Sequence, residues 1–234
     1  MVASEITKGK SKPVSELRIN RFLSHTYLIM SLGLVVTAFV ASLTANNLNL
    51  MLRIHLNPWI AFGLFLLQIM VVVSIGGVAM RLSPLISGLL FVFYSALTGL
   101  TLSSIFLLYT QEEIAIVFWL TAGTFFITSL FGLLTKRDLS SSGSVLFMLL
   151  IGWTFTWLLS WLFPFSSFNW LVSYLGIAIF VGLTAHDTQR LKKLGDQLDQ
   201  HPARNGLAVI GALTLYLNFI NLFLLILRAS SRRR

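Results

Sequence analysis

Long apolar runs separated by short polar connections dominate the chain. A stretch of about 20 apolar residues is long enough to cross the hydrocarbon core of a bilayer as a helix. A backbone in lipid must satisfy its own hydrogen bonds, so each such run is expected to be helical. Seven runs occur, at roughly 23–45, 58–79, 84–108, 114–134, 144–163, 168–187 and 207–228. The pattern predicts an all-α integral membrane protein with seven transmembrane helices.

The connections between the runs carry residues that end helices, namely Asn57-Pro58, Ser83-Pro84, Gly143 and Pro164. This organisation divides the chain into three parts. Residues 1–22 form a basic N-terminal tail, which we expect to be disordered or to end in a short interfacial helix. Residues 23–228 form the seven-helix membrane domain, and residues 229–234 form a basic C-terminal tail.

The composition agrees with a membrane protein, because 56% of the residues are hydrophobic and 11% are charged. A soluble domain carries about 25% charged residues. The net charge of +9 could indicate a nucleic-acid partner, but the basic residues lie between apolar runs. We therefore interpret them as topology signals that face anionic lipid, with no nucleic acid bound. The chain has no cysteine, which excludes disulfides and thiolate metal sites.

The Lys and Arg residues are distributed unevenly between alternate connections. The connections on the side opposite the N-terminus receive a single basic residue, Arg53, and they also contain the acidic pair Glu112–Glu113. Twelve basic residues fall on the N-terminal side: Lys8, Lys10, Lys12, Arg18, Arg21, Arg81, Lys136, Arg137, Arg190, Lys192, Lys193 and Arg204. Because cytoplasmic connections are enriched in basic residues, we expect the N-terminus and the connection at 188–206 in the cytoplasm.

The C-terminal tail conflicts with this rule. An odd number of spans places Arg228 and Arg232–Arg234 outside. Either the tail is tolerated there, or the last segment re-enters the membrane and returns to the cytoplasm. Seven full spans is the preferred interpretation.

Small and polar residues inside the runs indicate helix–helix contacts, because lipid-facing positions gain nothing from them. Asn218 and Asn221 in the last run are the strongest case, since an unpaired amide in hydrocarbon costs several kcal/mol. They are expected to face the protein interior, either as interhelical contacts or along a polar pathway, and Gln68 in the second run has the same two interpretations. Gly211 and Thr214 lie on the same face of the last run as the two asparagines. Close packing best explains the small and polar positions of two other runs, which are Gly88, Ser95, Gly99 and Ser103 in the third and Thr121, Thr124, Thr128 and Gly132 in the fourth.

Soluble-enzyme chemistry has no recognisable motif in the chain. The four histidines, His25, His55, His186 and His201, match no metal-ligand spacing. We expect neither an enzyme activity nor a cofactor. Asp187 borders a long apolar run, with Arg190 three residues later, so it is either an interfacial residue in a weak ion pair or a working group in a pore. His186 beside it is either an interfacial residue or a pH-responsive one.

Four stretches follow one another along the chain: "MRLSPLISGLLFVFYSALTGLTLSSIF" (80–106), "TKRDLSSSGS" (135–144), "GLTAHDTQRLKKLG" (182–195) and "ALTLYLNFINLFLLILR" (212–228). Together they resemble the transmembrane Bax-inhibitor-motif family, in its bacterial branch, from about residue 20 to 228. The resemblance implies a seven-helix fold with the last helix central among the other six. It also implies a pH-sensitive calcium leak that is gated near the cytoplasmic side by two aspartates, one on the sixth helix and one on the seventh.

This chain has one of the two aspartates that the resemblance implies. The resemblance places the sixth-helix aspartate at Asp187, after His186 where the family more often has tyrosine, and the seventh-helix aspartate at Asn218. Two close carboxylates oppose each other's ionisation and share a proton, which makes a pH sensor. An aspartate–asparagine pair has no such coupling, so pH sensing is doubtful in this chain.

The resemblance and the residues together suggest two functions. The first is a calcium leak through the bundle of a bacterial inner-membrane protein, gated by the sixth and seventh helices. Asp187 and the amide oxygens of Asn218 and Asn221 would serve as transient oxygen ligands, near Arg190 and His186, without tight metal binding. The alternative is a non-conducting regulator that binds a membrane-embedded partner, such as a quality-control protease, through its basic N-terminal tail.

Overall fold

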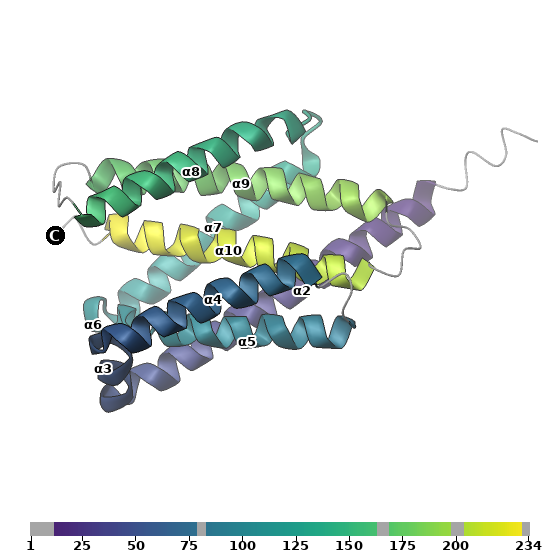
Figure 1. The fold of residues 1–234 in the computed structure, drawn as a ribbon. Helices are drawn as coiled ribbons and strands as arrows, with labels where there is room; N and C mark the ends of the chain where they lie inside the picture. Colours follow the sequence, from purple (N-terminus) through teal and green to yellow (C-terminus); the bar gives the residue numbers. More distant parts are fainter. Residues whose placement is uncertain (1–11, 79–82, 163–168, 198–203, 231–234) are drawn as a thin grey trace, which may run out of the picture. The chain divides into compact units, whose positions relative to one another are not determined.

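The structure is a computed structural model, which describes residues 12–78, 83–162, 169–197 and 204–230. The described residues form helices joined by short turns, with no strand among them (Figure 1). Their helices are α2 (Lys12–Ala45), α3 (Leu48–Leu56), α4 (Pro58–Val78), α5 (Pro84–Leu102), α6 (Ile105–Leu108), α7 (Gln111–Leu134), α8 (Ser140–Leu162), α9 (Asn169–Gln197) and α10 (Arg204–Ser230).

The predicted fold class is confirmed. Among the described residues, seven segments are long and apolar enough to cross a membrane, one in each of α2, α4, α7, α8, α9 and α10 and one formed by α5 with α6. The last of them is the most buried, with 61% of its most apolar window inside the protein. That burial agrees with the interior position expected for the last helix. The window of α8, in contrast, contains no buried residue.

Three helix boundaries differ from the predicted ones. The helix α2 is continuous from Lys12, so residues 12–22 are helical, as one of the two expectations for the tail had it, but they extend the first span and form no separate short helix; residues 1–11 lie outside the described part. A short helix, α3, occupies the connection between the first two spans. The helix α9 continues ten residues beyond Asp187 to Gln197, so the first half of the predicted connection 188–206 is helical.

Two of the predicted helix-stop residues, Asn57 and Ser83, accept hydrogen bonds at the start of the next helix, whereas Gly143 lies within α8 and ends no helix. The Ser83 hydroxyl accepts a hydrogen bond from the Ile86 amide at 3.4 Å, and Pro84 starts α5 where a missing N–H costs nothing. The Asn57 side chain accepts a hydrogen bond from the Trp59 amide before α4. Pro164 lies outside the described residues.

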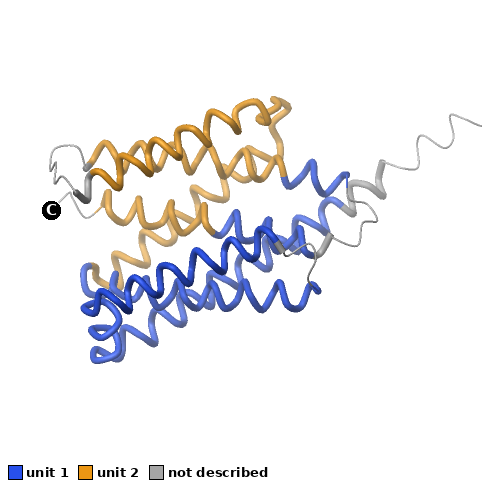
Figure 2. The backbone as a smooth tube through the Cα atoms, in the orientation of Figure 1, with its two compact units in different colours: residues 1–108, 191–216 blue, residues 109–190, 217–234 orange. Residues whose placement is uncertain are grey.

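The chain forms two compact units (Figure 2). Unit 1 contains residues 1–108 and 191–216, and unit 2 contains residues 109–190 and 217–234. The helices α9 and α10 therefore each contribute residues to both units: α9 passes from unit 2 into unit 1 at Leu191, and α10 passes from unit 1 into unit 2 at Leu217.

The core of unit 1 forms around Tyr216 of α10, whose side chain is fully buried. Its hydroxyl lies 2.6 Å from the Thr37 hydroxyl of α2, and its ring packs edge-to-face against Phe91 and Tyr94 of α5. The helices α2 and α5 meet where a Cβ on Gly99 would overlap the Thr37 carbonyl oxygen. Small residues allow such close approach of helices in a membrane. The predicted packing positions Ser95, Gly99 and Ser103 are confirmed, whereas a Cβ on Gly88 would meet no atom within 4 Å.

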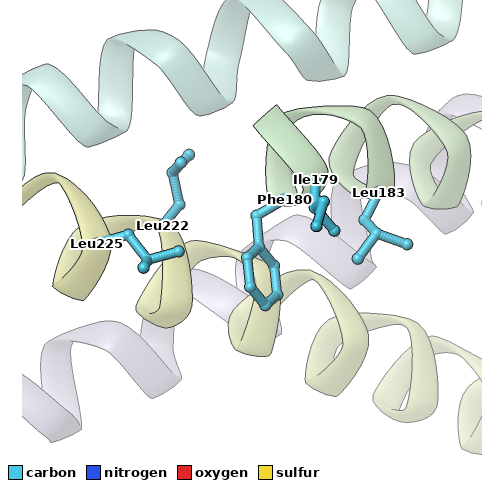
Figure 3. Packing of buried hydrophobic residues seen from close by; sticks show 5 residues of the cluster. All are labelled: Ile179, Phe180, Leu183, Leu222 and Leu225. Atoms are coloured by element: carbon cyan, nitrogen blue, oxygen red, sulfur yellow. The ribbon is translucent and has the colours of Figure 1, made fainter. Parts of the chain in front are cut away.

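The core of unit 2 is an apolar cluster between α9 and α10, formed by Ile179, Phe180 and Leu183 with Leu222 and Leu225 (Figure 3). Trp153 of α8 packs edge-to-face on Phe180 and donates its indole N–H to the Val172 carbonyl at 2.7 Å. These contacts hold α8, α9 and the second half of α10 together around the polar residues described next.

Candidate functional site

Asp187 and Asn218 form a direct hydrogen bond within unit 2. The Asn218 side-chain nitrogen Nδ2 donates to Asp187 Oδ2 at 2.8 Å. Asn218 is 5% exposed, and the Asp187 side chain is 13% exposed. The structure therefore brings together the two positions that the family resemblance singles out, one from α9 and one from α10.

The length of α9 explains how these two residues reach the same depth. Asp187 lies about 15 Å before the end of α9 at Gln197, at 1.5 Å per residue. Asn218 lies about 21 Å after the start of α10 at Arg204. Since α9 does not end at Asp187, this residue lies well inside a helix and not at a helix end.

His186 provides a second partner for the same carboxylate. Its Nδ1 lies 3.0 Å from Asp187 Oδ1, and its side chain is 14% exposed. On its other edge the imidazole faces Gly143 of α8, where a Cβ would overlap Nε2. His186 also lines a hollow of about 400 Å³ with the hydroxyl-bearing Ser141 and Ser142. The imidazole therefore lies between the carboxylate and this hollow.

Asn221 and Arg190, the other residues predicted for the site, make no hydrogen bond to Asp187 or Asn218 among the described residues. Asn221 is partly buried, but its Nδ2 donates to the Leu217 carbonyl of its own helix at 2.8 Å. Arg190 is exposed, one turn beyond Asp187. Within the described residues, the hydrogen-bond partners of the Asp187 carboxylate are Asn218 and His186. Gln68, the other ambiguous amide, donates to the Thr101 hydroxyl of α5 at 2.9 Å, which is an interhelical contact.

Gln189 is a site residue that sequence reasoning missed. Its side chain is buried and fastens the turn between α7 and α8 in two places. Oε1 accepts from the Leu139 amide and Nε2 donates to the Arg137 carbonyl, each at 2.8 Å. A strongly polar residue two positions after Asp187 was the available signal. Gln189 thereby fixes the start of α8, which carries Gly143 against His186.

An aromatic cluster holds α10 beside Asn218. Phe219 is 3% exposed and packs edge-to-face against Phe118 and Phe125 of α7, with ring centroids 5.6 and 5.5 Å away. Edge-to-face pairs of this kind contribute about 0.5–1.5 kcal/mol each beyond area burial. The polar contact at Asn218 and the aromatic contact at Phe219 therefore hold neighbouring residues of α10 against two different helices, α9 and α7.

The site offers limited chemistry. The polar groups in contact at its centre are the Asp187 carboxylate, the Asn218 amide and the His186 imidazole, and no three of the described His, Asp and Glu residues gather as metal ligands. Calcium sites usually need six to eight oxygen ligands. The arrangement is therefore suited to a transient cation contact, and not to a tight calcium site.

Fold and site together define a polytopic, all-α membrane protein with an acid–amide pair between two of its helices. The chain belongs to the family described as "Inhibitor of apoptosis-promoting Bax1", whose sequence profile matches residues 19–234. This match confirms the resemblance drawn from the four motifs.

The relatives cover nearly the whole chain. It is 44% identical over 218 residues to "Inner membrane protein YbhL" of Escherichia coli (strain K12), which covers 92% of this chain and 93% of that protein. It is 42% identical over 216 residues to an uncharacterized protein of Borreliella burgdorferi, with 92% and 93% covered. It is 33% identical over 232 residues to "Uncharacterized protein RP147" of Rickettsia prowazekii, with 97% and 96% covered.

Proposed function

We propose that the protein is a cation leak pathway of a bacterial inner membrane, with calcium as the cation, closed by the hydrogen bond between Asn218 and Asp187. The observation that carries this proposal is a largely buried carboxylate within an apolar helix, bonded to a neutral amide. Charged residues inside membrane spans are costly, and they usually mark ion or proton pathways. The name of the Escherichia coli relative supports the inner-membrane location.

The hydrogen bond gives the pathway a defined closed state. While Asn218 Nδ2 donates to Asp187 Oδ2, one carboxylate oxygen is occupied, and α10 is held on α9. When α10 moves away, that oxygen and the side-chain oxygen of Asn218 become ligands of the kind that hard cations prefer. A single carboxylate binds calcium weakly, which suits passage because a conducting site must also release its ion.

The experiment measures calcium entry into proteoliposomes that contain the purified protein alone. Asn218→Ala removes the donor that holds α10 closed, and it should raise the leak about tenfold, since a hydrogen bond to a charged group contributes about 1.5–3 kcal/mol. Asp187→Asn keeps a hydrogen-bonding side chain but removes the charge that attracts the cation, and it should lower the leak. Asn221→Ala is the matched control, because that amide bonds to its own helix.

The competing function has its own outcome in this experiment. If neither the unmodified protein nor Asn218→Ala passes calcium at any pH, the pathway is wrong and a non-conducting regulator of a membrane partner is favoured. One observation suits that alternative: α8 exposes large apolar side chains, among them Phe147, Phe155 and Trp157, on which a partner's helix could pack. An equal rise in leak for Asn218→Ala and Asn221→Ala would contradict the assigned closing contact.

A further inference from the structure

His55 lies between two backbone carbonyl groups in unit 1, far in sequence from the proposed pathway. It occupies the last turn of α3, a helix that Asn47 caps and that buries Met51 and Ile54. Its Nδ1 lies 2.9 Å from the Met51 carbonyl oxygen, and its Nε2 lies 3.1 Å from the Thr101 carbonyl oxygen of α5. The ring therefore connects α3 to the end of α5.

Both partners of the His55 ring are carbonyl oxygens, so the ring can bond to them only by donating hydrogen. A carbonyl oxygen accepts hydrogen bonds and cannot donate them. A neutral imidazole carries one N–H, so it can satisfy one of the two carbonyl groups and directs a lone pair at the other. An imidazolium carries two N–H groups and satisfies both. The geometry around His55 is thus complete when the ring holds a second proton.

The electrostatic surroundings suit a positive charge at this point. His55 lies at the C-terminal end of α3, and Thr101 is the penultimate residue of α5, so two helix ends with partial negative charge meet the ring. The Thr101 carbonyl belongs to the last turn of α5, where carbonyl groups have no partner within the helix, and besides the ring it accepts a long hydrogen bond from the Ser104 hydroxyl at 3.3 Å. A cation that donates to such a carbonyl is stabilised by the helix dipole as well as by the hydrogen bond.

The described helices of unit 1 that pack on α3 are α2, α4 and α5, and few of their residues are charged or titratable. Neither α4 nor α5 contains an acidic or basic residue, and the phenol of Tyr94 in α5 lies about 10 Å along the helix from Thr101. The charged groups of α2 lie between Lys12 and His25, twenty residues or more from its C-terminal end at Ala45, and its one phenol, Tyr27, is also distant from that end. Within α3 itself, Arg53 is the neighbouring charge, and it is exposed.

We propose that His55 is a proton-binding site whose protonated ring fastens α3 to the end of α5, and whose neutral ring releases one of the two carbonyl groups. The apolar anchors Met51 and Ile54 keep α3 in place in either state, so loss of the proton loosens the helix without detaching it. Gln68 makes a second, non-titrating connection from α4 to the Thr101 hydroxyl at 2.9 Å. Loss of a proton therefore weakens the α3–α5 contact selectively. With the orientation predicted from the basic residues, this site faces the outside.

The test uses the full chain in lipid nanodiscs and two measurements on it. Nitrogen-15 spectra of histidine-labelled protein report how many ring nitrogens carry hydrogen, with the exposed His25 as an internal reference. Hydrogen exchange of residues 48–56, corrected for the intrinsic pH dependence of exchange, reports how firmly α3 is held. We expect both His55 nitrogens to carry hydrogen at about pH 5.5 and one of them at about pH 8.5, with the protection of α3 falling about tenfold between these two pH values.

Two variants separate the ring from the helix around it. His55→Gln cannot gain a charge, so the protection of α3 should no longer depend on pH. Gln68→Leu breaks the α4 connection alone, and the pH dependence of α3 should persist. The proposal is overturned if α3 is equally protected at both pH values in the unmodified protein, or if the same tenfold fall remains in His55→Gln. The first of these needs no variant, so a poorly folded His55→Gln would not prevent a decision.

Discussion

Gly143, in the first turn of α8, faces the imidazole of His186 so closely that a Cβ on residue 143 would overlap Nε2. The other ring nitrogen lies 3.0 Å from the Asp187 carboxylate. The ring of His186 can occupy this position because residue 143 is glycine and has no side chain. Gly143 therefore also permits the contact between His186 and Asp187, one of the two contacts of this carboxylate. This relationship connects the turn between α7 and α8 to the proposed pathway.

Gly143→Ala should displace His186 without unfolding the protein, because the group that must move is the end of a flexible side chain. We expect the nitrogen-15 signal of His186 Nδ1, assigned with His186→Gln, to shift as its contact with Asp187 is lost. Gly152→Ala on the same helix is the control, since a Cβ there would meet no atom within 4 Å. An unchanged His186 signal in Gly143→Ala would show that the ring position does not depend on this glycine.

Gly132 of α7 lies against the backbone of α9, whereas Gly143 lies against a side chain. A Cβ at this position would overlap the Ala185 carbonyl oxygen of α9, so α7 and α9 would have to separate. Gly132→Ala should lower the free energy of unfolding by about 1–3 kcal/mol, the usual cost of overpacking. The measurement is thermal unfolding in detergent, beside Gly123→Ala, which lies on the same helix with open space around it. Equal midpoints for the two variants would contradict the close packing of α7 on α9.

The sequence predicted the spans well because membrane thickness demands runs of about 20 apolar residues, and these are visible in any reading of the chain. It did not predict the helical residues 188–197, since Arg190, Lys192 and Lys193 suggest a polar connection. A helix can continue beyond the bilayer once it has started, however, and the stretch contains no proline.

The site could be predicted in part. The motif resemblance placed Asp187 and Asn218 at corresponding positions, and their contact is found. The sequence could not predict that Asn218 bonds to α9 whereas Asn221 bonds to its own helix, because both lie on the polar stripe of α10. Which amide meets a neighbour depends on the rotation and depth of α10 against α9, and those are set by packing such as the cluster around Leu222.

Orientation can be tested in this cysteine-free chain with single cysteines and a membrane-impermeant thiol reagent on intact cells. Gln197→Cys, exposed at the end of α9, should resist labelling because its surroundings are basic and expected in the cytoplasm. Glu112→Cys, exposed at the start of α7, should react from outside. Ser231→Cys should also react if the last span is complete, whereas protection there would favour a re-entrant last segment. Ready labelling of Gln197→Cys would reverse the predicted topology.

The pair of Asp187 with an amide predicts how the leak depends on pH. Asparagine does not titrate, so the coupled titration of two carboxylates is absent, and flux should vary little between about pH 6 and 8. Asn218→Asp would place a second carboxylate against the first, and two such groups cannot readily ionise together. At low pH a shared proton would hold α10 on α9, and at high pH two negative charges would repel, so the leak of this variant should rise with pH. Flux against pH in proteoliposomes is measured for the unmodified protein, Asn218→Asp and Asp187→Asn. A steep response that is already present in the unmodified protein and lost in Asp187→Asn would contradict the prediction, and would make His186, at 3.0 Å from the carboxylate, the first residue to substitute next.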